Sequence, residues 1–293
     1  MPQKATYASI FDNEIWVRII TSWDAWETIS IVWSTHGDEI VWMEVFKYLI
    51  HAFKIEEKIK KWTIQFIIGN KQAYFNGTRL IDIDMNRVWG FDEAHSQTYE
   101  YTRAKEIYPY LRESAYILDL HSTTTPSVSM LIPNKAIDSD LLNSMDSRYL
   151  IHGITSFLSG KPLIEFDHDL QNSRVQSLVI EGWQHYKEET IKNTIENTLI
   201  LLNHYGFIEY IPEQKIDDKI ILEVKKCFYA KSLNINFLYT DNPASFQEVK
   251  KWQIIYEDDG EKVIAEEDFI IIMPSKPRYI WEEIGYVSIR KNP

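Results

Sequence analysis

Cysteine is almost absent from this sequence of 293 residues, in which Cys227 is the only one. A single thiol cannot form a disulfide within the chain, and it cannot build a site that holds zinc through several cysteines. The composition therefore excludes a disulfide framework and a multi-cysteine zinc site within one chain.

Long apolar runs are missing as well. No segment approaches the ~18 uninterrupted apolar residues of a membrane-spanning helix, and the N-terminal segment MPQKATYASIFDNEIW has no apolar run of signal-peptide length. Hydrophobic residues make up 45% of the chain and charged residues 25%, which is typical of a soluble globular protein. We therefore expect a cytoplasmic protein without a membrane partner.

Positive charge is scarce, since 31 lysines and arginines stand against 43 acidic residues and give a net charge of −12. Such a chain repels nucleic acid over most of its surface, so we expect no nucleic-acid partner. It also repels an anionic small molecule at long range. A carboxylate ligand would therefore need a local cluster of arginines.

The first two thirds of the chain alternate β-rich runs with helical patterns. β-Branched and aromatic residues predict strands at residues 14–20 and 28–33. Residues 38–53 predict a helix with an acidic start, and residues 188–203 predict a second helix that Gly206 would end. Further apolar runs of buried-strand length are residues 62–68, 115–120 and 175–180. Such runs favour an α/β fold with a mixed central sheet and helices on both faces.

The pattern changes after residue 207, where short runs of strand character are separated by polar turns and no helical period is visible. These runs are residues 220–225, 234–238, 252–256, 262–265 and 269–273. We therefore predict two domains, an α/β domain at residues 1–207 and a small all-β domain at residues 208–293.

The first motif with chemical character is STHGDE at residues 34–39, between a predicted strand and a predicted helix. Open α/β sheets place their ligand sites at such strand ends. His36 and Glu39, three residues apart, can supply a nitrogen and an oxygen to one Zn²⁺ ion. The spacing alone is a weak signal, because a second His-x-x-Glu, His185 to Glu188, occurs without an assigned role.

The second motif is DLHS at residues 119–122, at the end of another apolar run. His121 could supply a third ligand from a different strand end, as in catalytic zinc sites with three protein ligands and one open position. Alternatively, His121 is a histidine satisfied at the edge of the sheet. Asp119 either supports a ligand from behind or caps the strand end.

The third motif places Arg79, Asn86 and Arg87 close together in an otherwise acidic chain. Arginine offers a planar fork that binds a carboxylate through two hydrogen bonds, so these residues could form a carboxylate clamp. The alternative is that Asp82 and Asp84 pair with the arginines as surface salt bridges of little energetic weight.

The fourth element is a carboxylate, Glu181, that follows the apolar run at residues 175–180. A carboxylate at a buried strand end is costly unless it is used or paired. Glu181 could be a general base or a structural acid at a helix N-terminus. Glu165 competes for the first role, but its neighbours, including Pro162, favour a loop.

Taken in this order, the four elements resemble the aspartoacylase/succinylglutamate desuccinylase family, a branch of the zinc carboxypeptidase-like hydrolases. The matching segments are HGDE (His36–Glu39), Arg79 with DMNR (Asp84–Arg87), DLH (Asp119–His121) and Glu181. The family often has Glu-x-Gly at the last position, whereas here Gly182 follows Glu181 directly.

The resemblance implies a zinc-dependent amidohydrolase with one Zn²⁺ per chain that cleaves small N-acyl amino acids. The site residues it implies are the zinc ligands His36, Glu39 and His121, the general base Glu181, and the substrate-carboxylate binders Arg79, Asn86 and Arg87. Arg174 is a candidate for a further substrate-binding arginine. The C-terminal stretch is similar to the β domain that many members carry.

Two other functions stay open at this point. A zinc carboxypeptidase that acts on peptides would share the metal site and differ in the size of its pocket. A carboxylate-binding protein without metal would not need the intact ligands and the intact Glu181. The sequence does not determine the acyl group, the amino acid or whether the chain forms a homo-oligomer.

Overall fold

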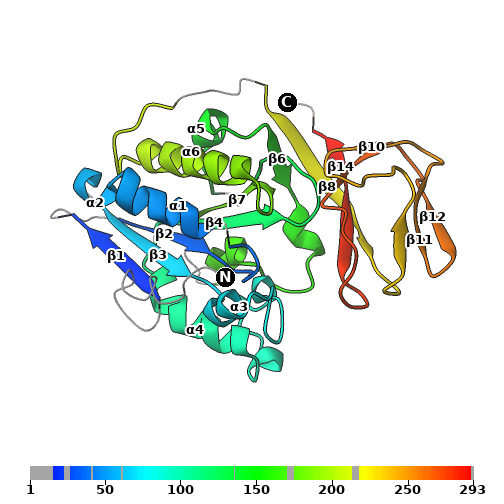
Figure 1. The fold of residues 1–293 in the computed structure, drawn as a ribbon, viewed down its shortest axis with the longest axis horizontal. Helices are drawn as coiled ribbons and strands as arrows, with labels where there is room; N and C mark the ends of the chain where they lie inside the picture. Colours follow the sequence, from blue (N-terminus) through cyan, green and yellow to red (C-terminus); the bar gives the residue numbers. More distant parts are fainter. Residues whose placement is uncertain are drawn as a thin grey trace.

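The computed structural model describes residues 16–22, 27–40, 42–60, 62–134, 136–169, 175–212 and 218–291. Arg174 lies outside these ranges, as does the start of the strand predicted at residues 14–20. Figure 1 shows a broad sheet between two layers of helices. A smaller group of strands lies beside the C-terminal strands of this sheet. The predicted fold class is confirmed.

Eleven strands of the described chain form one mixed sheet. In sheet order they are β1 (Val17–Thr21), β3 (Thr63–Ile68), β2 (Thr28–Trp33), β4 (Tyr116–Thr123), β7 (Gln176–Gln184), β5 (Met130–Pro133), β6 (Tyr149–His152), β8 (Ile220–Tyr229), β14 (Glu283–Arg290), β13 (Phe269–Ile272) and β10 (Glu248–Val249). β3, β2, β4 and β7 are parallel to one another, and their carboxyl ends therefore meet at one edge of the sheet.

Helices cover both faces of the sheet because its central strands are apolar on both sides. In β2, Ile31 and Trp33 pack with α1 and α6 on one face, whereas Val32 packs with α4 on the other. The helices are α1 (Trp42–Lys47), the π-helix η3 (Tyr48–Ala52), α2 (Ile55–Lys58), α3 (Lys71–Asn76), α4 (Tyr99–Leu111), α5 (Ser139–Ser144), α6 (Glu188–His204) and the 3-10 helices η4 (Met85–Arg87), η5 (Glu93–His95), η6 (Ile154–Phe157) and η7 (Leu163–Asp169). Within the described ranges, each helix is too short or too polar to cross a membrane.

The helix predicted at residues 188–203 is confirmed as α6. The helix predicted at residues 38–53 begins later, at Trp42, and continues as the π-helix η3. The reason is that residues 35–40 form a turn, and this turn carries the first motif.

The C-terminal part is all-β, as predicted, and it extends the central sheet. β8 pairs in parallel with β6, and β14, β13 and β10 follow in order. A second, three-stranded sheet consists of β12 (Glu261–Ile264), β11 (Ile254–Asp258) and β9 (Ile235–Phe237). It shares a separate apolar core with β8, β13 and β14. The domain boundary at residues 207 and 208 stays a prediction, because a hydrogen-bonded sheet joins the two parts.

A buried carboxylate, Glu100, anchors the loop between α3 and α4. One of its oxygens accepts hydrogen bonds from the backbone N–H of Ile81 (2.6 Å) and from the side chain of Asn70 (2.9 Å). The other oxygen accepts from the backbone N–H groups of Asp82 (3.1 Å) and Ile83 (3.2 Å). Glu100 therefore fixes the backbone within the third motif.

Replacing Glu100 with Gln should lower the free energy of unfolding by about 2–4 kcal/mol, because one oxygen becomes an NH₂ group that faces backbone donors. Urea unfolding measures this change. Glu93→Gln is the matched control, since Glu93 is exposed and accepts a hydrogen bond from the hydroxyl of Tyr101. Equal losses of stability in the two variants would contradict the anchoring role.

Candidate metal centre

The first pair of candidate ligands lies on the turn that follows β2. The backbone of this turn passes so close to α3 that a Cβ atom on Gly37 would lie 2.2 Å from the carbonyl carbon of Ala73 and 2.2 Å from the nitrogen of Tyr74. Only glycine fits at such a distance. The glycine of the HGDE motif therefore allows the turn that brings His36 and Glu39 together.

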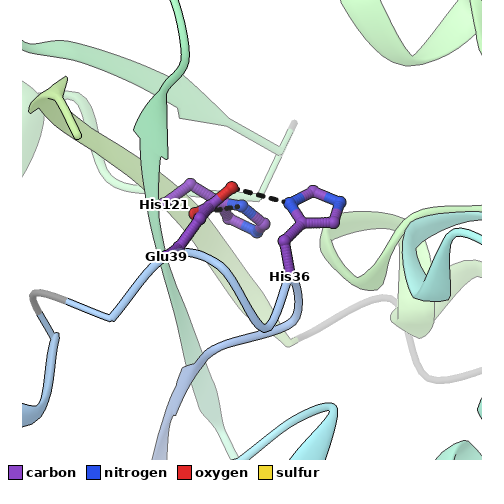
Figure 2. A group of neighbouring side chains, drawn as sticks. All are labelled: His36, Glu39 and His121. Atoms are coloured by element: carbon purple, nitrogen blue, oxygen red, sulfur yellow. Dashed lines mark hydrogen bonds and ion pairs between the residues drawn. The ribbon is translucent and has the colours of Figure 1, made fainter. Parts of the chain in front are cut away.

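Three buried side chains converge at this edge of the sheet. His36 Nδ1 lies 2.8 Å from Glu39 Oε1, and His121 Nδ1 lies 3.3 Å from Glu39 Oε2. Figure 2 shows the carboxylate of Glu39 next to both imidazole rings. One ligand atom from each of the three residues lies within 4.8 Å of the others. Because β4 pairs in parallel with β2, the first two motifs meet as the sequence predicts.

A second carboxylate holds each histidine ring from behind. His121 Nε2 lies 2.8 Å from Asp119 Oδ2, and His36 Nε2 lies 3.0 Å from Asp84 Oδ1. Nδ1 of each ring therefore lies on the side of Glu39, and Nε2 lies on the side of the second carboxylate. Carboxylates placed in this way orient histidine ligands in metal sites. The donor set of two nitrogens and one carboxylate therefore fits Zn²⁺.

The charges around this group also suit a cation. Burial acts to raise the pKa of Glu39, but the charges of His121 and His36 outweigh it and hold this pKa well below its usual range. Burial acts to raise the pKa of Asp84 too, and His36 and Arg87 bring it well below its usual range. Two buried carboxylates thus stay ionised side by side, and a bound cation would stabilise both.

Glu181 lies directly opposite His121 in the pairing of β4 with β7. Its Oε2 is buried and has no hydrogen-bond partner among the described residues. Burial raises the pKa of Glu181 to about 7, with the charge of Glu39 acting in the same direction and that of His121 against it. A carboxylate that titrates near neutral pH can accept and return a proton. The competing Glu165 lies in the 3-10 helix η7.

Arg79 reaches the centre from the third motif. Its Nη1 lies 3.4 Å from Glu39 Oε1, and its Nη2 lies 3.7 Å from Asp84 Oδ2. Asp84 is 4% exposed, so the alternative of a surface salt bridge is wrong for this residue. Its role as the partner of His36 was missed, although its position as the first residue of DMNR marks it as part of the motif.

Arg87 and Asn86 make different contacts. Arg87 donates hydrogen bonds to the backbone carbonyl of Asn86 (3.0 Å) and to the side chain of Glu283 (3.1 Å). Asn86 Nδ2 lies 3.3 Å from His121 Nε2, and its Oδ1 accepts a hydrogen bond from the backbone of Leu163 (3.0 Å). Arg87 therefore meets the C-terminal part of the chain, whereas Asn86 supports the ligand group.

Two further residues beside the centre were not predicted. The backbone N–H of Ser122 donates to Glu39 Oε2 (2.9 Å), and Ser122 Oγ lies 2.6 Å from His185 Nδ1. His185, which had no assigned role, thus holds the residue that orients Glu39. Nearby, a Cβ atom on Gly182 would lie 2.5 Å from Thr194 Oγ1, so the glycine after Glu181 allows β7 to pack against α6.

A cavity of about 570 Å³ lies in front of the centre, and His36, Glu39, Arg79 and Glu181 line it. The C-terminal part of the chain also lines this cavity. Its lining residues include Phe237, Tyr279, Glu283 and Tyr286. No motif in the sequence marks these residues, because they come from short strands and loops far along the chain from the four motifs.

The fold and this site define a class of proteins with a buried His-Glu-His group at the carboxyl edge of a mixed sheet. Residues 25–204 match the model of the succinylglutamate desuccinylase/aspartoacylase catalytic domain. The chain belongs to this family, whose members are hydrolases that act on amide bonds.

Individual relatives are distant in sequence. The chain is 22% identical over 280 residues to the succinylglutamate desuccinylase of Shewanella frigidimarina, with 86% of this chain and 80% of that protein covered. It is 34% identical over 111 residues to a probable aspartoacylase of Prochlorococcus marinus, with 33% of this chain and 35% of that protein covered. The crystal structure of the Vibrio parahaemolyticus succinylglutamate desuccinylase superposes with a TM-score of 0.73 at 18% identity and covers 94% of this chain and 86% of that one. At this identity the superposition shows the fold.

The raised pKa of Glu181 predicts how the stability of the metal-free protein depends on pH. The folded state keeps the proton of this carboxyl up to pH of about 7, whereas an unfolded glutamate loses it near pH 4.3. Folding is therefore progressively destabilised as the pH rises between these values. Glu181→Gln lacks this cost and should stabilise the metal-free protein by about 3–4 kcal/mol at pH 8, and by only about 1 kcal/mol at pH 5.

Thermal unfolding of chelator-treated protein at the two pH values measures this difference, with Glu165→Gln as the control. An increment in stability that is the same at pH 5 and pH 8 would show that Glu181 titrates normally.

Proposed function

We propose that this protein is a zinc-dependent amidohydrolase that cleaves small N-acyl amino acids, with one Zn²⁺ held by His36, Glu39 and His121. The observation that carries the proposal is the arrangement of the two histidines. Each presents Nδ1 to the carboxylate of Glu39, and each is held at Nε2 by a further carboxylate. Zinc also accounts for the concentration of buried negative charge at this point.

The residues around the metal supply the proton transfers. When bound, zinc supplies Lewis-acid chemistry, in which it lowers the pKa of water and polarises an amide carbonyl. Glu181 faces the same cavity and is the general base, which takes a proton from water and returns it to the departing amine nitrogen. Arg79, which lines the cavity beside the ligands, can stabilise negative charge that develops on the carbonyl oxygen.

The substrate class follows from the relatives and from the arginines. The relatives are named succinylglutamate desuccinylase and probable aspartoacylase, which points to N-acyl amino acids. Arg79, Asn86 and Arg87 are the proposed binders of the substrate carboxylate, and the two arginines line the cavity. The cytoplasmic location and a homo-oligomer stay predictions.

A hydrolysis screen of the zinc-loaded protein tests this proposal. N-acetyl amino acids, N-succinyl amino acids and dipeptides form its three arms. Release of free amino acid from the N-acyl substrates supports the proposal. Release from dipeptides alone would identify a carboxypeptidase, and no release by a protein that holds stoichiometric zinc would contradict the proposal.

Glu181→Gln should reduce kcat by about 10²–10⁴, because the amide keeps the shape of the side chain and removes the base. Zinc content should be unchanged, since Glu181 is not a proposed ligand. Glu165→Gln is the matched control and should leave the rate nearly unchanged. Loss of zinc in Glu181→Gln would show that Glu181 is a ligand. A reduced kcat in Glu165→Gln together with a normal kcat in Glu181→Gln would show that Glu165 is the general base.

Arg87→Lys should raise KM about tenfold or more while zinc content stays the same. Lysine keeps the charge but loses the planar fork, which here contacts a carbonyl and a carboxylate and lines the cavity. Steady-state kinetics with the best substrate of the screen measure the effect. An unchanged KM would remove Arg87 from the substrate-binding residues.

A further inference from the structure

Arg87, a proposed binder of the substrate carboxylate, is already paired with a carboxylate of the protein. Its Nη2 lies 3.1 Å from Glu283 Oε2, and the side chains of Arg87 and Glu283 are 12% and 6% exposed. Glu283 begins β14, and it reaches Arg87 across 196 positions of the chain. The third motif thus contributes the positive charge of Arg87 to the wall of the cavity, and the C-terminal part contributes the negative charge of Glu283.

Some hydrogen-bonding atoms of this cavity have no partner among the described residues. On the donor side they include Nε of Arg79 and Nε of Arg87. On the acceptor side they include Oε2 of Glu181, which the proposed reaction uses, and Oε1 of Glu283, which it does not use. Buried polar atoms without partners are costly. Glu283 Oε1 is such an atom on a residue that lines the cavity.

The neighbouring Glu282 shows the contrast. It also lines the cavity, but both of its oxygens are occupied, because the backbone N–H of Arg278 donates to Oε2 and the side chain of Arg278 donates to Oε1. Glu283 keeps one carboxylate oxygen, Oε1, without a hydrogen-bond partner among the described residues.

We propose that Glu283 determines specificity by binding a positively charged group of the substrate, and that the site selects N-acyl amino acids with a basic side chain over those with an acidic one. The α-carboxylate of such a substrate is an acceptor for the arginines, and its side-chain ammonium is a donor for Glu283. An acidic side chain would instead meet the carboxylate of Glu283, which repels it. The inference rests on the proposed function, since that function supplies the N-acyl amino acid.

The test measures binding, so that it does not depend on turnover. The probes are Nα-acetylornithine, Nα-acetylglutamine and Nα-acetylglutamate, which differ mainly in the charge of the side chain. Zinc-loaded Glu181→Gln protein, in which the base is removed, is titrated with each probe by calorimetry. The same titrations are repeated after adding Glu283→Gln, and separately after adding Glu282→Gln as the control for loss of one charge at the same cavity.

With Glu283 intact, the ornithine compound should bind most tightly and the glutamate compound most weakly. Glu283→Gln should reduce the ratio of these two affinities by about ten- to a hundredfold, as expected for loss of a hydrogen bond between charged groups. Glu282→Gln should leave the ratio within about threefold. These results together would support the inference.

Tighter binding of the glutamate compound by the protein with Glu283 intact would overturn the inference, as would binding of none of the probes. Equal changes in the Glu282 and Glu283 variants would overturn it too, because the effect would then reflect overall charge. If Glu283→Gln fails to fold, the order of the three probes with Glu283 intact decides the matter. A wild-type protein that hydrolyses no acyl amino acid, while its Glu181→Gln variant binds the probes in the expected order, would refute the proposed function and leave the ligand class standing.

Discussion

The carboxylate of Glu39 between two imidazoles is the interaction on which the site depends. It is buried, it contacts Nδ1 of both His36 and His121, and it receives a hydrogen bond from the backbone N–H of Ser122. Such a cluster survives inside a protein only if charge and hydrogen bonds are balanced. Here the parallel strands β2 and β4 bring the three side chains together, and a bound divalent cation would complete the balance.

The C-terminal strands give the site its other half. Since β8 and β14 continue the central sheet, residues of the C-terminal part line the same cavity as the candidate ligands. The metal-binding edge and the substrate-binding wall therefore come from different parts of the chain. We therefore expect changes at single residues of the C-terminal part, such as Glu283, to alter substrate choice without disturbing the proposed zinc ligands.

The sequence alone predicts those parts of the fold and of the site for which the signal lies within a short segment of the chain. The parallel strands β3, β2, β4 and β7 follow from buried apolar runs, α6 follows from apolar positions on one helical face, and the motifs identify the group that the structure brings together. Strands β5, β6 and β14 were not predicted. Helix α4 was not predicted, because its sequence contains Pro109 and mixes charged with aromatic residues. A surface salt bridge remained open for Asp84, because the sequence around one residue does not show whether its side chain is buried. The contact of Arg87 with Glu283 depends on the whole sheet order and has no local signal.

The most direct test of the central claim is zinc-edge X-ray absorption of protein reconstituted with one equivalent of zinc. The account predicts a shell of nitrogen and oxygen neighbours at about 2.0–2.1 Å with the outer scattering of two imidazoles. It also predicts that His121→Ala does not retain stoichiometric zinc, because two ligands rarely hold Zn²⁺ tightly. A sulfur neighbour at about 2.3 Å, or a wild-type spectrum without imidazole scattering, would contradict the assignment of His36, Glu39 and His121 as the zinc ligands.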